Sequence, residues 1–278
     1  MEHVIWQYWE TRGHKPAFID GLHRLARRNS GCEVILVTPE TLRRYLPELP
    51  REVLQIKQIA HKADMIRSLL VARHGGMWLD SDAIVLHDLN WLFELLQTYE
   101  FICFNNRGRL EETRPWVRVN CFLSRPDGHV AREWVRRQHA KFPRTKYEWE
   151  EIGTELLHPI CLAESKRVKV LPFEMICPIP WDRVAEFEQK VMDPEKIIEK
   201  CFIVMLSNAS LATRAPALRR LTCQQIAEED HLLAAIMRAA LRGDPVDGPP
   251  GPTRLNSAAE DPTSWFTRAL ATLTKFRG

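Results

Sequence analysis

No stretch of the sequence is apolar for long enough to cross a bilayer, because no apolar run approaches the roughly 18 residues that a membrane span requires. The chain also begins without the basic and apolar regions of a secretory signal peptide. Its seven cysteines include no Cys-x-x-Cys pair, and most lie in apolar runs, which indicates reduced core residues. These absences predict a soluble, cytoplasmic protein.

An excess of charge of one sign is also lacking. The formal net charge is +3, and Lys and Arg are scattered through helical stretches, so nucleic-acid binding is not indicated. What the sequence does have is length and apolar content. With 278 residues, 45% of them hydrophobic, it can bury the core of one large α/β domain.

The N-terminal part of the chain alternates between strand and helix patterns. Apolar runs at residues 4–9 (VIWQYW) and 33–39 (EVILVTP) predict two strands, with a helix opened by Pro16 between them. Residues 38–40 (Thr-Pro-Glu) supply an N-cap and a Pro at the first position of another helix. Strand, helix, strand, helix is the order typical of a parallel α/β sheet.

A longer helix is predicted over residues 59–74, where Gly75 and Gly76 end it before the next strand. Further strands are predicted at residues 101–105, 117–123, 168–172 and 202–206, and further helices at about 127–141, 151–163 and 222–242.

These elements predict that residues 1–242 form one domain. Pro and Gly density predicts a linker over 243–263, and residues 264–278 form an amphipathic helix that could dock on the domain, a partner or a membrane surface.

The stretch GGMWLDSDAIVL places Asp80 and Asp82 one residue apart between apolar runs. In a strand both carboxylates would lie on one face, close to Trp78 and Ile84. Two like charges in such a setting are costly to desolvate unless a cation lies between them, which favours a divalent metal site. The alternative is a strand end that turns into solvent.

The preceding helix carries Asp64 and Arg67 at a spacing of three, which puts them on one face. The Gly75–Gly76 reversal lets that face look back over the end of the strand that holds Asp80 and Asp82. Carboxylates, a cation and an arginine at one place suit a nucleotide diphosphate, and ligands of open α/β sheets lie beyond the carboxyl ends of the strands.

Three segments carry a family resemblance: VIWQYWETRG, HKADMIRSLLVARHGGMWLDSDAIVL and VNCFLSRP. They resemble the capsular-polysaccharide-synthesis branch of the D-x-D sugar transferases, related to glycosyltransferase family 32 and, more distantly, to the clostridial glucosylating toxins. The likeness is strong over residues 60–90, fair over 1–125 and weak beyond. It implies a GT-A fold: a single Rossmann-like α/β domain whose mixed, mostly parallel sheet is flanked by helices.

The resemblance also implies roles for particular residues. Asp82 would ligate Mn²⁺ or Mg²⁺, and Asp80 would support the metal and bond the ribose or donor sugar. Asp64 and Arg67 would hold donor-sugar hydroxyls. Trp9 would stack on the uracil, with Trp6 as the runner-up, although plain core packing is the alternative for either ring.

The sequence departs from these relatives in its second half. They often supply a late His or a Ser/Glu cluster to the metal and diphosphate site, and the nearest candidates here are Ser207, Asn208 and Ser210, which could equally cap a strand end. The segment EEIGTELLHP lacks the Thr-Gly-Pro order found at its place in some relatives. Asn120 is a polar residue within a predicted apolar strand. It is either an acceptor-side residue of the site or a core amide whose hydrogen bonds are satisfied.

Together these features predict a metal-dependent, retaining transferase that acts in capsular or other surface polysaccharide synthesis. It would move a sugar from a nucleotide-sugar donor, expected to be a UDP-sugar, to a saccharide or protein acceptor. Two alternatives stay open: a toxin-like transferase that modifies proteins, and a non-catalytic nucleotide-sugar binder. A haloacid-dehalogenase-type phosphatase also uses a D-x-D, but it needs a late acidic loop, for which only GDPVD is available.

Overall fold

The computed structural model describes residues 2–10, 15–106, 116–141, 144 and 146–243. The predicted C-terminal helix over 264–278, and all of the predicted linker except Gly243, lie outside the described residues. Within the described part, no helix is both long and apolar enough to cross a membrane.

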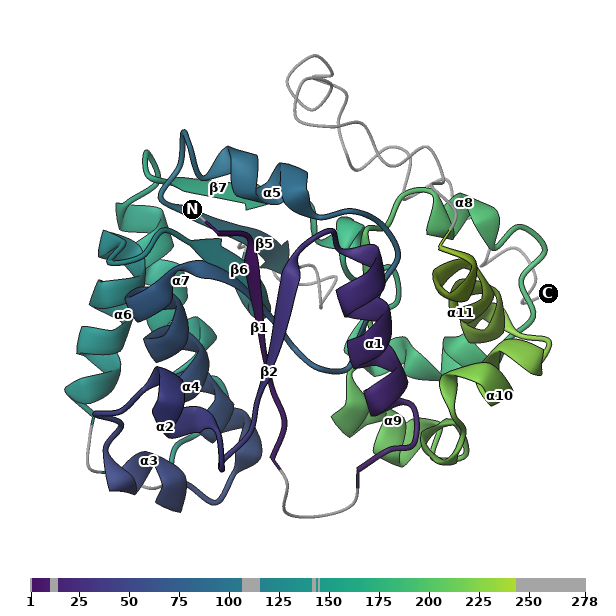
Figure 1. Ribbon diagram of the computed structural model, residues 1–278, viewed down its shortest axis with the longest axis horizontal. Helices are drawn as coiled ribbons and strands as arrows, with labels where there is room; N and C mark the ends of the chain where they lie inside the picture. The colour runs from purple at the N-terminus through teal and green to yellow at the C-terminus, as the bar shows by residue number, and fades with distance from the viewer. Residues whose placement is uncertain (1, 11–14, 107–115, 142–143, 145, 244–278) are drawn as a thin grey trace.

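The centre of the molecule is a six-stranded sheet with the strand order β2-β1-β3-β6-β5-β7 (Figure 1). Its strands are β1 (Val4–Tyr8), β2 (Glu33–Val37), β3 (Gly76–Leu79), β5 (Phe101–Asn106), β6 (Trp116–Ser124) and β7 (Val168–Leu171). Strand β1 pairs parallel with β2 and β3, and β5 pairs parallel with β7, whereas β6 runs antiparallel to both of its neighbours. The prediction of a mixed, mostly parallel α/β sheet is confirmed.

One face of the sheet is covered by α4 (Ile59–His74), α6 (His129–His139) and α7 (Thr154–Ala163), as Figure 1 shows. The core on this side is aromatic and aliphatic, with Trp78, Phe122 and Trp134 fully buried. The short helices α2 (Leu42–Tyr45) and α3 (Arg51–Gln55) border it, and α5 (Asn90–Leu95) and the 3-10 turn η1 (Phe173–Met175) cover the other face.

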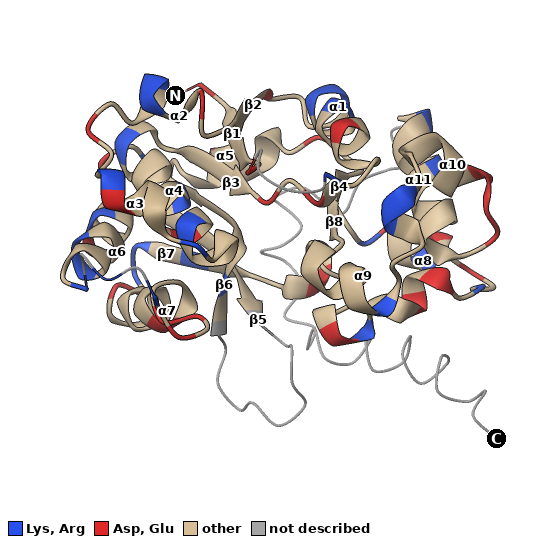
Figure 2. Ribbon diagram, turned by 90° about the horizontal axis from the view of Figure 1, so that it is seen from below, with Lys and Arg blue, Asp and Glu red and all other residues tan. Residues whose placement is uncertain are grey.

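A second layer is built around a two-stranded antiparallel sheet of β4 (Ala83–Val85) and β8 (Ile203–Met205). Figure 2 shows this pair between the main sheet and a group of helices. The helical elements of this layer are α1 (Ile19–Asn29), η2 (Trp181–Glu188), α8 (Glu195–Ile198), α9 (Asn208–Arg214), η3 (Leu218–Arg220), α10 (Cys223–Glu228) and α11 (Leu232–Arg242). They enclose a separate apolar core.

In two of the predicted helices a side-chain hydrogen bond accounts for the difference from the structure. The helix expected to start at Thr38 begins at Leu42, because the Thr41 hydroxyl accepts a hydrogen bond from the Thr38 N–H and closes a turn before the helix. The helix predicted over 222–242 is split into α10 and α11. Arg238 donates to the carbonyls of Ala227 and Glu229, so the end of α10 is capped by a side chain of α11.

The step from α4 into β3 depends on the two glycines that the sequence predicted as a stop. Gly75 caps α4 with φ +68°, and Gly76 follows with φ +94°. A Cβ at Gly76 would lie 2.6 Å from the carbonyl oxygen of Val4 on the neighbouring strand. Only glycine combines this backbone conformation with this close approach.

We therefore expect Gly76→Ala to destabilise the fold more than Gly243→Ala. Gly243 also has positive φ, but a Cβ there would meet only the Arg28 side chain, at 3.5 Å or more. The backbone conformation alone should lower the free energy of unfolding by about 1 kcal/mol in both variants. The clash with Val4 should add to this loss only at Gly76. Urea denaturation measures both, and equal losses would show that the strand pair relaxes around the added methyl group.

Candidate functional site

Asp80 and Asp82 lie in the turn that leaves the main sheet for the second layer. Strand β3 ends at Leu79 and β4 begins at Ala83, so the two acids are not on a strand, contrary to the alternation expected from the sequence. The turn is anchored on both sides. The Asp80 N–H donates to the carbonyl of Asn120 (2.9 Å), and the Ser81 hydroxyl donates to the carbonyl of Tyr8 (2.8 Å). The acids therefore lie at the carboxyl end of β3, where ligands of α/β sheets bind.

Arg67 joins Asp64 and Asp80 into one cluster. Its guanidinium is 3.5 Å from Asp64 Oδ1 and 3.3 Å from Asp80 Oδ1. The same group lies 5.1 Å from the ring centre of Trp78 and donates to the carbonyl of Val119 (2.5 Å). Helix α4 thus brings together the Asp64–Arg67 face and the strand end, as the helical spacing predicted.

Asp82 is held by the chain that follows β8. Its Oδ2 accepts a hydrogen bond from the Asn208 N–H (2.6 Å), and its carbonyl accepts one from the Leu206 N–H (3.0 Å). Ser207 has φ +53°, so the chain reverses there into α9. The segment that the sequence singled out does reach Asp82, but through a backbone N–H. The Asn208 side chain is engaged by Arg219 (3.0 Å).

The negative charges of the carboxylates in this cluster are poorly balanced by nearby positive charge. Burial, together with the charges of Asp80 and Glu150, raises the pKa of Asp64 to about 7 against the pull of Arg67. Burial and the charge of Asp80 raise the pKa of Asp82 to about 6, and burial raises the pKa of Asp80 as well. Arg67 cannot balance all of these acids, so an added cation would be stabilised here.

The site also includes a segment whose proximity to Asp64 the sequence reasoning missed. A Cβ at Gly153, just before α7, would lie 2.9 Å from Asp64 Oδ2, so the backbone there packs directly on the carboxylate. Gln138 joins the two segments, because its amide donates to the carbonyls of Asp64 (3.0 Å) and Ile152 (2.8 Å). The glycine in EEIGTELLHP was the signal that could have shown this close approach.

The two candidate tryptophans have different surroundings. Trp6 is 4% exposed and packs on Tyr45 and His74. Its indole N–H donates to the carbonyl of Gly75 (2.9 Å), at the start of β3, whereas Asp80 follows the other end of that strand. Core packing describes this ring. Trp9 is only partly buried and follows β1 at the same sheet edge as the acids. The structure therefore leaves Trp9 as the better placed ring for a ligand.

The acids suit a cation shared with a ligand. Among the described residues, no group of three or more His, Cys, Asp or Glu side chains is arranged to hold a metal ion. A cation bound to a diphosphate needs only one or two carboxylates, because phosphate oxygens supply the other ligands. Asp80 and Asp82 meet this requirement. The buried Oδ1 of Asn120 has no hydrogen-bond partner in the described part of the chain, so a satisfied core amide does not account for it.

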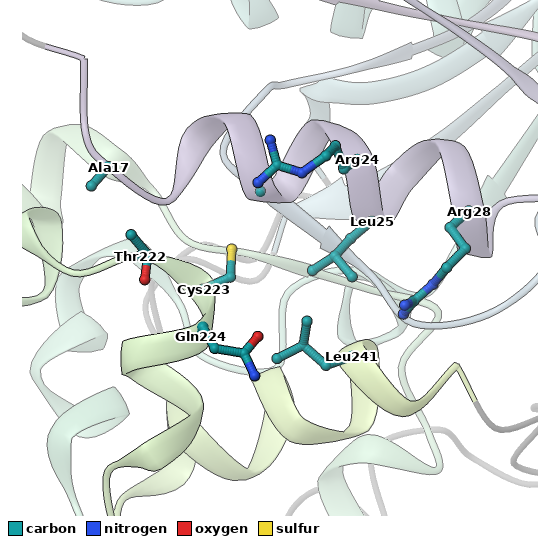
Figure 3. Close-up of a pocket in the computed structure, with 9 residues that line it drawn as sticks. Ala17, Arg24, Leu25, Arg28, Thr222, Cys223, Gln224 and Leu241 are labelled. Carbon is teal, nitrogen blue, oxygen red and sulfur yellow. The ribbon is translucent and has the colours of Figure 1, made fainter.

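A cavity of about 360 Å³ lies elsewhere, between α1, α10 and α11 (Figure 3). Its walls include Arg24 and Arg28 from α1, Cys223 from α10 and Leu241 from α11. None of the acids at the end of β3 lines it. It is therefore separate from the carboxylate cluster.

Asp64→Asn should stabilise the ligand-free protein, and more so at higher pH. The pKa of Asp64 is 3.8 by reference and about 7 in the folded chain, so the folded state holds this proton more tightly. Ionisation of Asp64 thus lowers stability progressively as pH rises from about 4 to about 7. The melting temperature of Asp64→Asn should exceed that of the unchanged protein by several degrees. This difference should be larger at about pH 8 than at about pH 5.

Asp230→Asn is the matched control, because the Asp230 side chain is 80% exposed and Lys190 lowers its pKa. It should give a small change of opposite sign. A gain for Asp64→Asn that does not depend on pH would contradict the assignment of a raised pKa.

No curated protein matches the sequence of this chain significantly. Similar solved structures are the PaToxG glycosyltransferase (10% identity, 86% of each chain covered, TM-score 0.47) and a glycosyltransferase involved in glycosylation of the major capsid of PBCV-1 (11% identity, 78% of this chain and 98% of that one, TM-score 0.40). Mouse xyloside xylosyltransferase 1 is similar at 10% identity over 74% of this chain and 97% of that one, with a TM-score of 0.40.

At such identities and TM-scores, these likenesses carry no weight for activity. A family model gives a more direct assignment. The model described as "Capsular polysaccharide synthesis protein" matches residues 1–148, which is just over half of the 278 residues and includes Asp64, Arg67, Asp80 and Asp82. The chain belongs to the capsular polysaccharide synthesis protein family.

Proposed function

We propose that the protein is a metal-dependent glycosyltransferase of the GT-A type, which transfers a sugar from a UDP-sugar to an acceptor hydroxyl with retention, in the synthesis of capsular or other surface polysaccharide. The observation that carries the proposal is the arrangement of Asp80 and Asp82. Both lie beyond the carboxyl end of β3, both have a raised pKa, and Asp82 is fixed by the Asn208 N–H. Membership of a polysaccharide synthesis family supports a sugar as the transferred group.

Asp82, with Asp80, would hold Mn²⁺ or Mg²⁺, which when bound neutralises charge on the leaving diphosphate. Arg67 is held by Asp64, Asp80 and the Val119 carbonyl, so its guanidinium needs little rearrangement to meet a ligand. Asp64, whose carboxylate packs against Gly153, would accept bonds from donor-sugar hydroxyls. Trp9 is the ring proposed to stack on the base.

Asn208 takes a more limited part in this proposal than the sequence suggested, whereas Ser207 and Ser210 stay proposed contacts to the cation or the diphosphate. The Asn208 N–H orients the Asp82 carboxylate, and Arg219 occupies the Asn208 amide oxygen. Asn208 would therefore influence a bound cation only by orienting Asp82. The Asn120 Oδ1 is buried and has no hydrogen-bond partner among the described residues, and the Asn120 carbonyl anchors Asp80, so this Oδ1 is proposed instead to accept a bond from a ligand.

Release of nucleotide from a panel of UDP- and GDP-sugars tests the proposal. We expect turnover of a UDP-sugar that requires Mn²⁺ or Mg²⁺ and is abolished by EDTA. Asp82→Asn should lower kcat by about 10²-fold or more, because it removes the charge that binds the cation. Asp230→Asn, at an exposed acid outside the cluster, is the control.

Three results separate the candidate functions. Binding of UDP and Mn²⁺ without turnover of any donor would identify a nucleotide-sugar binder. Transfer to a protein and to no saccharide would identify a protein-modifying enzyme. Failure to bind or hydrolyse any donor would contradict the proposed transferase. Turnover that Asp82→Asn leaves unchanged would contradict the role given to Asp82.

A further inference from the structure

The segment Tyr147-Glu148-Trp149-Glu150-Glu151, which leads into α7, exposes a large aromatic ring. Trp149 is 64% exposed, whereas Trp78 and Trp134 are fully buried. Its neighbour Glu148 is also exposed. Most of this indole lies outside the core, between acidic residues, so its face is available to a ligand.

The segment that carries Trp149 is firmly held. The Glu151 carboxylate forms ion pairs with Lys141 (2.8 Å) and Arg144 (2.7 Å) and accepts a hydrogen bond from the Glu148 N–H (2.9 Å). The Tyr147 hydroxyl donates to the carbonyl of Arg144 (2.5 Å). These bonds fix the backbone on both sides of the indole, so little order remains to be imposed when a ligand binds.

This segment lies beside the carboxylate cluster. The Trp149 ring centre is 6.5 Å from that of His61, which precedes Asp64 by three residues on α4. That spacing corresponds to a rise of about 4.5 Å along the helix. Glu150 is near enough for its charge to raise the pKa of Asp64, and Gly153 packs on the Asp64 carboxylate. The exposed ring thus borders the proposed donor site on the side of α4 and α7.

The residues around the ring indicate what it can bind. Glu148 and Glu150 flank it in the chain, and acidic residues mark the turn into α7 in Figure 2. Lys141 and Arg144 pair with Glu151, so the segment offers carboxylates without a strong net charge. A neutral sugar suits both features, because its C–H face can lie on the indole while its hydroxyls donate to carboxylates.

We propose that Trp149, with Glu148, binds the acceptor as a neutral saccharide and positions it next to the donor site. This inference rests on the proposed transferase function, since it assigns the acceptor side of the same site. Trp149 is a binding residue in this scheme, with no part in bond making or breaking.

The test is ¹⁹F NMR of protein labelled with 5-fluorotryptophan, in which the Trp149 signal is identified by its loss in Trp149→Phe. The probes are methyl glycosides of glucose, galactose, N-acetylglucosamine and rhamnose, added with and without UDP and Mn²⁺. We expect at least one glycoside to shift the Trp149 signal. The affinity for that glycoside, measured by isothermal titration calorimetry, should fall about tenfold or more in Trp149→Ala. The affinity for UDP with Mn²⁺ should stay within about twofold of the unchanged protein.

Trp181→Ala is the matched control, because Trp181 is also exposed (38%) but belongs to η2. It should leave the glycoside affinity unchanged, and melting curves show whether each variant is folded. If UDP and Mn²⁺ bind but no glycoside shifts the Trp149 signal, the acceptor inference is overturned. If a glycoside shifts that signal while UDP and Mn²⁺ do not bind, the saccharide site stands and the proposed donor chemistry fails.

Discussion

The Arg67 guanidinium is the group on which the rest of the site depends. It contacts carboxylates from α4 and from the turn after β3, the Val119 carbonyl on β6 and the face of Trp78. A buried cation with several partners keeps the acids of two elements in one place. Its single charge is too small for the carboxylates around it, so the same arrangement that positions the acids also leaves them electrostatically unsatisfied.

This imbalance is a feature expected of a binding site and not of a core. Burial and mutual repulsion raise the pKa of Asp64 and Asp82, which means that the ligand-free fold is less stable with these groups ionised. The surrounding structure offsets the loss with well-packed apolar cores on both faces of the sheet. Clusters of perturbed acids at the end of a strand are characteristic of functional sites.

Sequence patterns predicted elements best where local chemistry decides the outcome. Helix α4 begins and ends at the predicted residues 59 and 74, because its apolar spacing and the Gly75–Gly76 stop act within a few residues. Patterns failed where a distant or competing side chain intervened. The Thr41 hydroxyl delays the helix expected at Thr38, and Arg238 caps α10 inside the helix expected over 222–242. The assignment of Asp80 and Asp82 to a strand failed because the chain leaves the sheet at Leu79.

By itself the sequence determined the α/β class, the shared face of Asp64 and Arg67 and the approach of that face to the paired acids, since helical period and glycine conformation are local properties. Only the tertiary structure decided that Asp82 is held by the backbone of Asn208, 126 residues later, and that Gly153 packs on Asp64. It also placed Trp6 in the core and left Trp149 exposed. Contacts of this kind depend on how distant elements pack together, and no periodicity along the chain encodes them.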